Sequence, residues 1–212
     1  MKAQSKKTVA SSRTTHQVRI IGGRWKRTPL NVITAEGLRP TPDRVRETVF
    51  NWLNHLVDGN WQALRCLDLF AGSGALGFEA ASRGAAQVTM IEFHTPAFRQ
   101  LEQVAEKLGA DNIELIRADA LTVASNMRLQ QRRFDLIFLD PPFNQGVLQK
   151  ILPLCSNLLT ENGLLYVEAE QALVMGELAD DYLAGWHVIR ADKAGSVYFH
   201  ILQRNILAHD GI

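Results

Sequence analysis

The residues best suited to chemistry in this sequence are Asp140, Pro141, Pro142 and Phe143, which follow the apolar run Leu136 to Leu139. The Asp140 carboxylate and the Pro141 carbonyl can each accept an N–H, and the Phe143 ring can stack on a flat partner. Consecutive prolines restrict φ, so the turn is stiff. The tetrapeptide suits a flat heterocycle with an exocyclic amine, although taken alone it is more often a proline-rich turn with Phe143 in the core.

Acidic residues also mark the ends of other predicted buried strands. Four runs carry one each: Leu64 to Phe70 contains Asp68, Gln87 to Glu92 ends on Glu92, Asn112 to Arg117 precedes Asp119, and Phe134 to Asp140 ends on Asp140. The carboxyl ends of parallel strands lie along one edge of a sheet, and ligands bind there. Each residue alone can be a helix cap or a surface charge. Together they predict a single carboxylate-lined crevice.

A glycine-rich turn follows the first of these runs. It reads Asp68-Leu69-Phe70-Ala71-Gly72-Ser73-Gly74, and small residues after it predict a helix that ends near Gly84. Glycines let the backbone pass close to a ligand, and the helix N-terminus offers unpaired N–H groups. The turn also satisfies G-x-G-x-x-G with Glu92 twenty positions after Gly72, as in dinucleotide-binding folds. Asp119 and the tetrapeptide favour a cofactor without phosphates instead, because carboxylates repel a pyrophosphate.

The remaining pattern predicts an α/β fold. A fifth strand is expected over Gly163 to Glu168, and Trp186 to Arg190 with Ser196 to Leu202 predict a closing antiparallel pair. Strands that alternate with helical segments indicate a mostly parallel, doubly wound sheet of seven strands with an antiparallel last strand. With 212 residues and 46% hydrophobic composition, the chain is long enough for one full core.

An N-terminal extension precedes this sheet. Val18 to Ile21, Gly22-Gly23 and Thr28 to Ile33 predict a hairpin. A helix is expected from Asp43, which is available as its N-cap, with Arg44 and Arg46 on its outer faces. We expect a disordered basic tail over residues 1–17, the hairpin and helix over 18–58, the catalytic domain over 59–205 and a tail over 206–212.

The charge distribution is uneven although the net charge is only +1. Residues 1–50 hold eleven Lys or Arg against three Asp or Glu. The basic residues of the hairpin, interleaved with Trp25, favour contact with a polyanion such as RNA through phosphates. These residues are Arg19, Arg24, Lys26 and Arg27. For the first fifteen residues alone, a solvated tail is the better interpretation.

Other features exclude several classes of protein. Cys66 and Cys155 lie in apolar segments without metal-ligand spacing, so we expect buried thiols, no metal and a reducing cytoplasm. The first thirteen residues are polar and basic, which predicts no export signal. No run is apolar enough to span a membrane.

The ordered motifs resemble those of class I S-adenosylmethionine-dependent methyltransferases, with a Rossmann-like fold. More narrowly, Arg19-Ile20-Ile21-Gly22-Gly23-Arg24, Arg39-Pro40-Thr41-Pro42 and Arg44 to Leu53 resemble the RsmD family. That family methylates the guanine N2 amine in small-subunit (16S) ribosomal RNA. The resemblance covers Val18 to Leu202 and implies S-adenosylmethionine as cofactor and small-subunit ribosomal RNA as substrate. Because the basic area is small for tight RNA binding, we expect the 30S particle as the partner, and we expect the enzyme to be a monomer.

The resemblance also implies roles for individual residues. Asp140, Pro141, Pro142 and Phe143 would be catalytic. Cofactor-binding residues would be Asp68, Phe70, Ala71, Gly72, Ser73, Gly74, Glu92, Phe93, Asp119, Ala120 and Thr41; Phe93 and Leu121 would sandwich the adenine ring or, equally, belong to the core. RNA contacts are expected from Arg19, Arg24, Lys26, Arg27, Arg39 and Arg44, with Arg44 alternatively at the cofactor.

Other functions remain open at this point. DNA adenine and protein glutamine methyltransferases use a similar tetrapeptide, usually with Asn in first position, and Asp140 departs from that form. An NAD-binding oxidoreductase has no evident use for an amine-binding tetrapeptide. A non-catalytic RNA-binding protein with a vestigial site is disfavoured because every expected site residue is present.

Overall fold

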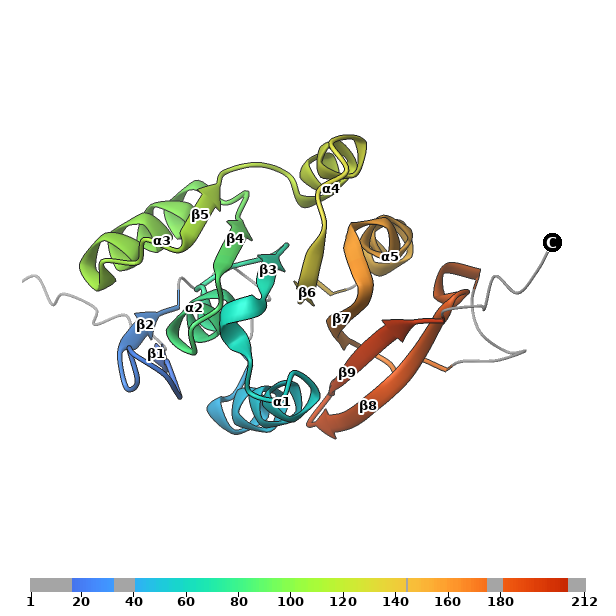
Figure 1. The fold of residues 1–212 in the computed structure, drawn as a ribbon, viewed down its shortest axis with the longest axis horizontal. Helices are drawn as coiled ribbons and strands as arrows, with labels where there is room; N and C mark the ends of the chain where they lie inside the picture. Colours follow the sequence, from blue (N-terminus) through green and yellow to red (C-terminus); the bar gives the residue numbers. More distant parts are fainter. Residues whose placement is uncertain (1–16, 33–40, 144, 175–180, 206–212) are drawn as a thin grey trace, which may run out of the picture.

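The computed structural model describes residues 17–32, 41–143, 145–174 and 181–205. Its strands are β1 Gln17–Arg19, β2 Pro29–Asn31, β3 Arg65–Asp68, β4 Gln87–Ile91, β5 Ile113–Ile116, β6 Phe134–Leu139, β7 Leu159–Ala169, β8 Trp186–Ala194 and β9 Val197–Arg204. Its helices are α1 Asp43–Leu56, α2 Ala75–Ser82, α3 Thr95–Leu108, α4 Ala120–Leu129 and α5 Val147–Leu158, with short 3₁₀ turns η1 Trp61–Ala63 and η2 Asp181–Leu183. Figure 1 shows their arrangement.

The main sheet has seven strands in the order β5-β4-β3-β6-β7-β9-β8. Strands β3 to β7 pair in parallel, whereas β9 is antiparallel to both β7 and β8. The predicted mostly parallel sheet with an antiparallel last strand is therefore confirmed. From β3 the chain proceeds outward through β4 to β5, and from β6 it proceeds the other way to β7. The β3/β6 boundary is thus the point where strand order reverses, and ligands bind at such points.

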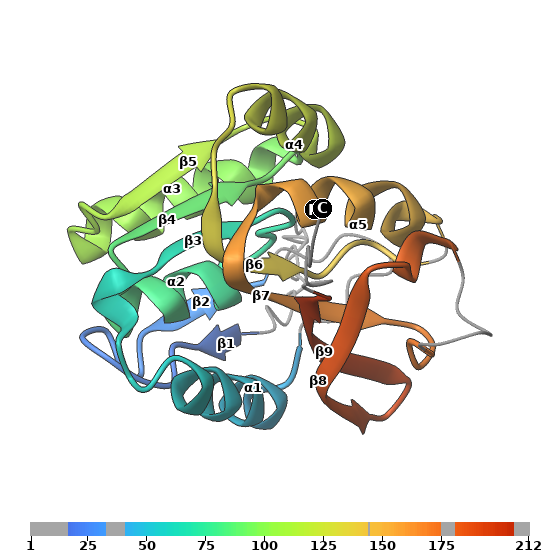
Figure 2. The same cartoon turned by 45° about the vertical axis from the view of Figure 1, so that its right-hand side comes forward.

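Side chains from adjacent positions of each strand enter opposite cores, as the pleat of a strand requires. Cys66 and Phe138 pack with α1, α2 and α3, whereas Leu67 and Leu139 pack with α4 and α5. Figure 2 shows helices on both sides of the sheet. Because both faces are covered, the central strands are apolar throughout, which made them recognisable in the sequence. Cys66 and Cys155 are buried free thiols, as predicted.

The β1–β2 hairpin packs against α2, beside which it lies in Figure 1. The predicted hairpin is present, since β1 and β2 pair antiparallel and residues 20–28 connect them. Within this connection, the buried Glu79 carboxylate accepts the N–H groups of Ile21 at 2.6 Å and Gly22 at 2.9 Å. Gly23 has a φ of +72°, and a Cβ there would clash with the Ser82 carbonyl. The two glycines thus permit close docking of this loop onto the helix.

Helix α1 differs from its prediction in two respects. Pro42 occupies the N-cap position without a side-chain hydrogen bond, and Asp43 is the first helical residue. Asp43 is not a cap because its oxygens bind the Arg19 Nε at 2.8 Å and an Arg46 Nη2 at 2.6 Å. Arg46 is fully buried and also donates to the Arg19 carbonyl at 2.9 Å, so its assignment to an outer face was wrong. Helical spacing alone cannot show that a charged residue is paired in a core.

Several element bounds also shift. Strand β3 is shorter than predicted and ends at Asp68, whereas β7, β8 and β9 are longer. Gln17, assigned to the tail, is the first residue of β1 and pairs with Asn31. Among the described residues, no helix is long and apolar enough to cross a membrane.

Candidate active site

A cleft of about 490 Å³ opens at the carboxyl ends of β3, β4, β5 and β6. Phe70 and Asp140 are 70 positions apart in sequence, yet both line this cleft because the four strand ends share one edge of the sheet. Of the predicted cofactor residues, the lining includes Phe70, Ala71, Gly72, Ser73, Glu92, Phe93, Asp119, Ala120 and Thr41; Leu121, Asp140 and Pro142 line it too. Three of the four acidic residues expected at one crevice, Glu92, Asp119 and Asp140, line this cleft.

Glu92 joins the tips of two strands. Its Oε2 accepts the Gly72 N–H at 2.8 Å, and its Oε1 accepts the His94 N–H at 2.6 Å. The glycine turn is therefore held against the end of β4. Gly74 takes the N-cap position of α2 with a φ of +81°, and a Cβ there would clash with the Phe78 ring. The turn directs its backbone toward the cleft in a shape that only glycine provides easily.

Asp68 and Gly74 do not line the cleft, so direct cofactor contact by these two is not supported. Asp68 is 1% exposed and accepts the Gly77 N–H through Oδ2 at 3.1 Å, while its Oδ1 has no hydrogen-bond partner. Burial raises the pKa of Asp68 from 3.8 to about 7. Asp68 thus ties the end of β3 to α2 from beneath the glycine turn.

Asp119 has the helix-cap role that was considered as its alternative. Its Oδ1 accepts the Thr122 N–H at 2.9 Å and the Thr122 hydroxyl at 2.8 Å at the start of α4. Its Oδ2 takes part in neither bond, and the residue still lines the cleft. Phe93 is 75% exposed, so it is no core residue, and Leu121 lines the same cleft. Leu121 also packs against the hydrophobic core beneath α4, so its alternative place in the core is supported as well.

A buried carboxyl cluster lies beneath the tip of β6, and sequence reasoning missed it. Leu139 pairs with Val167, so Asp140 leaves β6 beside Glu168 of β7. Glu168 is 3% exposed and its Oε1 accepts the Thr41 hydroxyl at 2.6 Å and the Tyr166 hydroxyl at 2.8 Å. Burial, followed by the charges of Glu168 and Asp68, raises the pKa of Asp140. Burial likewise raises the pKa of Glu168.

Arg46 is the countercharge of this region. It lines the cleft, and burial lowers its pKa against the opposing effects of Asp43 and Glu79. Its Nε and Nη1 are buried without hydrogen-bond partners. Arg44 is exposed and does not line the cleft, so its alternative place at the cofactor is not supported. The spacing of Arg46 from Val49 and Phe50 puts all three on one face of α1, but this spacing does not reveal the partners that allow a buried arginine.

The tetrapeptide Asp140-Pro141-Pro142-Phe143 separates two hollows. Asp140 and Pro142 line the cleft, whereas Pro141, Pro142 and Phe143 line an adjoining pocket of about 400 Å³, which we call the side pocket. Pro142, Gln145 and Val147 line both. A molecule in the cleft and another in the side pocket would meet at Asp140-Pro141-Pro142-Phe143. Among the described residues, no group of acidic, Cys or His side chains could hold a metal ion.

The expected RNA-binding residues are spread over the N-terminal extension. Arg19, Arg24, Lys26, Arg27 and Arg44 are exposed. Arg39 lies outside the described residues. Trp25 is buried and donates its backbone N–H to the Ser82 Oγ at 2.8 Å, so it belongs to the core and offers no stacking face. The hairpin loop therefore presents charge without an aromatic surface.

Comparison with known proteins gives concordant matches. A family model described as conserved hypothetical protein 95 matches residues 18–203. The chain is 40% identical over 195 residues to ribosomal RNA small subunit methyltransferase D of Escherichia coli strain K12, covering 89% of this chain and 90% of that protein. It is 37% identical over 193 residues to the Haemophilus influenzae protein of the same name, covering 88% and 94%. The solved structure of yhhF from Escherichia coli superposes with a TM-score of 0.73 at 39% identity and covers 89% of this chain and 98% of that chain.

Proposed function

Because this chain belongs to the RsmD family of methyltransferases, we propose that it methylates the exocyclic N2 amine of one guanine in 16S ribosomal RNA, with S-adenosylmethionine as the donor. The names of the relatives support the small subunit of the ribosome as the source of the RNA. The observation that carries the proposal is the position of Asp140-Pro141-Pro142-Phe143, which stands where the cofactor cleft meets a second pocket. The 30S particle as substrate, the monomeric state and the cytoplasmic location stay predictions.

The donor set of the cleft fits this cofactor. Glu92 and Asp119 present carboxylates, which suit ribose hydroxyls and an adenine amine and disfavour phosphates. The partnerless N–H groups of Arg46 suit the one anionic group of the cofactor, its carboxylate. Gly72, Ser73 and Thr41 would border its methionine part, and Phe93 and Leu121 its adenine. When bound, the cofactor supplies a methyl group on a positively charged sulfonium.

The tetrapeptide would orient the amine. Asp140 and the Pro141 carbonyl each accept one N–H, which leaves the nitrogen lone pair directed at the cleft. Phe143 stacks on the base from the side pocket. The stiff prolines hold these groups in place before the substrate arrives, and positioning of this kind contributes about 7 kcal/mol or more. A guanine in a duplex cannot reach the site unless it leaves its stack, which favours an RNA loop.

Asp140 would also receive the proton that the methylated amine releases. A carboxyl whose pKa is raised holds a proton better than an exposed one, because its charged form is destabilised by burial and by Glu168. The exposed Arg24, Lys26 and Arg27 of the hairpin loop support contacts with RNA phosphates. The basic area is small, so ribosomal proteins are expected to complete the recognition surface.

The test is tritium transfer from labelled S-adenosylmethionine to unmodified 16S RNA, assembled 30S particles and duplex DNA, followed by nucleoside analysis. We expect label in N2-methylguanosine. Label in methyladenine or in protein would support S-adenosylmethionine as the methyl donor but would refute a guanine of 16S RNA as the acceptor. Cofactor binding without any transfer would favour a non-catalytic protein.

A further inference from the structure

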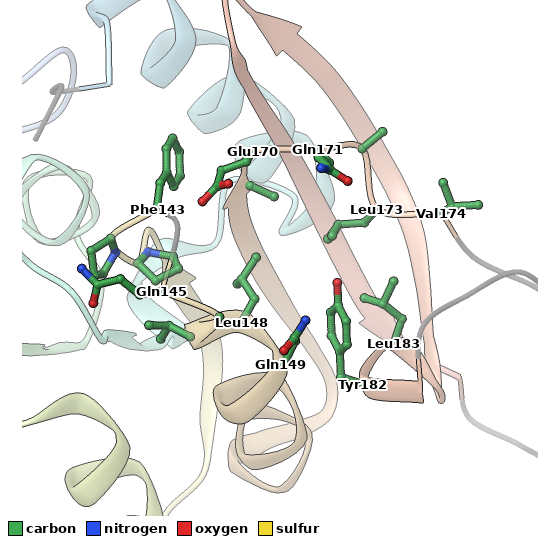
Figure 3. A pocket seen from close by; sticks show the side chains of 16 residues that line it. Phe143, Gln145, Leu148, Gln149, Glu170, Gln171, Leu173, Val174, Tyr182 and Leu183 are labelled. Atoms are coloured by element: carbon green, nitrogen blue, oxygen red, sulfur yellow. The ribbon is translucent and has the colours of Figure 1, made fainter. Parts of the chain in front are cut away.

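The side pocket is built by three separate segments. Its residues come from the tetrapeptide, from the start of α5, and from the chain that follows β7 together with η2. Figure 3 shows Phe143 and Glu170 near one another at one end, with Leu173, Tyr182 and Leu183 at the other. Ligand sites in proteins have comparable volumes, about 300 Å³ upward. A pocket of about 400 Å³ that shares its wall with the catalytic residues has room for a base.

The chemistry of the lining excludes some occupants. None of its residues is Lys or Arg, so it has no side chain to neutralise a phosphate. It combines apolar and aromatic side chains with the amides of Gln145, Gln149 and Gln171, and its one ionisable acid is Glu170. Such a mixture suits an uncharged heterocycle, which is stacked on its faces and hydrogen-bonded on its edge.

We propose that the side pocket receives the extruded guanine and that Glu170 selects it by accepting a hydrogen bond from the ring N1–H. The inference rests on the proposed function and adds a specificity-determining residue to it. In guanine, N1–H is adjacent to the amine that Asp140 and Pro141 would orient. A side chain that accepts a hydrogen bond from N1–H must therefore lie close to the tetrapeptide.

The strand register places Glu170 there. Since Leu139 of β6 pairs with Val167 of β7 in parallel, the chains that leave these two strands begin side by side. Glu170 is the first residue after β7, and Pro141 and Pro142 are the second and third after β6. In Figure 3 the Glu170 carboxylate is directed toward the side of the pocket where Phe143 lies. A base stacked on Phe143 thus has its edge toward this carboxylate.

The selection follows from hydrogen-bond complementarity. A carboxylate accepts hydrogen bonds and donates none, so it pairs with the guanine N1–H. Adenine presents an acceptor at N1, and two facing acceptors repel each other. A site built around a substrate N–H rejects an analogue that lacks it more strongly than an apolar pocket rejects a change of size. Glu170 would therefore exclude adenine even where the amine-binding groups could hold it.

The experiment compares guanine with 2-aminopurine, which keeps the 2-amine but has no hydrogen on N1. Small-subunit RNA would carry either base at the position that label transfer identifies, and kcat/KM would be measured for the parent and Glu170→Gln. We expect the parent to prefer guanine by at least about 100-fold. The amide of Glu170→Gln can accept or donate, so the preference should shrink about 10- to 100-fold.

Two further variants keep the result interpretable. Glu161→Gln changes an exposed glutamate near the other end of β7 and should leave the preference unchanged. Ala172→Trp adds bulk at an exposed lining residue and should abolish transfer while S-adenosylhomocysteine binding persists. An equal loss of kcat/KM on both bases in Glu170→Gln, or undiminished methyl transfer in Ala172→Trp, would overturn this inference and leave the proposed function standing. A parent that forms no N2-methylguanosine would instead refute the proposed function.

Discussion

As the pH rises, the free energy of unfolding of Asp68→Asn should increase relative to that of the parent protein. Asp68 is buried under the glycine turn, where Oδ1 has no hydrogen-bond partner. Burial raises its pKa to about 7, and the backbone N–H groups of Gly77 and Phe70 only partly offset this. A charged Asp68 is therefore destabilising inside the fold. Asparagine occupies almost the same volume, keeps one acceptor oxygen and never carries the charge.

The magnitude follows from the two pKa values of the carboxyl. Its pKa is 3.8 in the unfolded chain and about 7 in the fold, and one pKa unit corresponds to about 1.36 kcal/mol. Below pH 3.8 both states are protonated and no stability is lost. Between pH 3.8 and 7 the unfolded state releases the proton first, so stability falls as the pH rises. The loss is about 4 kcal/mol once the pH exceeds 7, and about 2.5 kcal/mol of it arises between pH 5 and 7.5.

The assay is urea unfolding of the parent and of Asp68→Asn at pH 5, 6, 7 and 7.5, at constant ionic strength. The difference in unfolding free energy should move in favour of the variant by about 2.5 kcal/mol across that range. Asp111→Asn, at an exposed position, controls for the loss of one negative charge. A difference that stays constant with pH would refute the argument that Asp68 is penalised by burial.

Three further results are expected. Asp140→Ala should lower turnover at least about 100-fold and spare S-adenosylmethionine binding, and near-normal turnover would show that this residue does not orient the amine. Arg24→Ala should reduce by about one the slope of log K for 16S RNA against log salt concentration; equal slopes in variant and parent would contradict a phosphate contact. Glu79→Ala should cost about 3 kcal/mol in urea unfolding because the N–H groups of Ile21 and Gly22 lose their acceptor, and a loss below about 1 kcal/mol would mean that the hairpin loop finds other partners.

Much of the fold could be predicted because its signals are local. The apolar runs of β3 and β6 stand out since both of their faces are buried. Helix α2 ends near the predicted residue because Gly84 has a positive φ value that a helix does not continue through. The parallel direction of most strands was predicted because strands alternate with helices along the chain, and the sheet confirms it. These features depend on residues that are near one another along the chain.

Long-range pairing explains the errors in the N-terminal extension. Asp43 has the side chain of a good N-cap, but its carboxylate binds Arg19 and Arg46. Arg46 belongs in the core because that partner, and the Arg19 carbonyl, are available there. Likewise, the hairpin itself was predicted, but nothing local in Gly22-Gly23 indicates that Glu79 holds this segment on α2. No pattern in the sequence states which distant residue will supply a partner.

For the site, local sequence patterns were enough to identify the groups that could bind a ligand and the strand ends that would bring them together. Asp140-Pro141-Pro142-Phe143, the glycine turn, Glu92 and Asp119 were recognisable because each stands at the end of an apolar run, and parallel strands end along a common edge.

Which of these groups face the cleft, and which support it from behind, depends on how the elements pack together. This packing placed Asp68 beneath the glycine turn, joined Thr41 to Glu168 across 127 positions of sequence, and set Glu170 beside the tetrapeptide. The reason is physical: a carboxylate exposed at a strand tip and one buried behind it look alike in sequence. Only the packing around each determines whether water, a ligand or another side chain satisfies its charge.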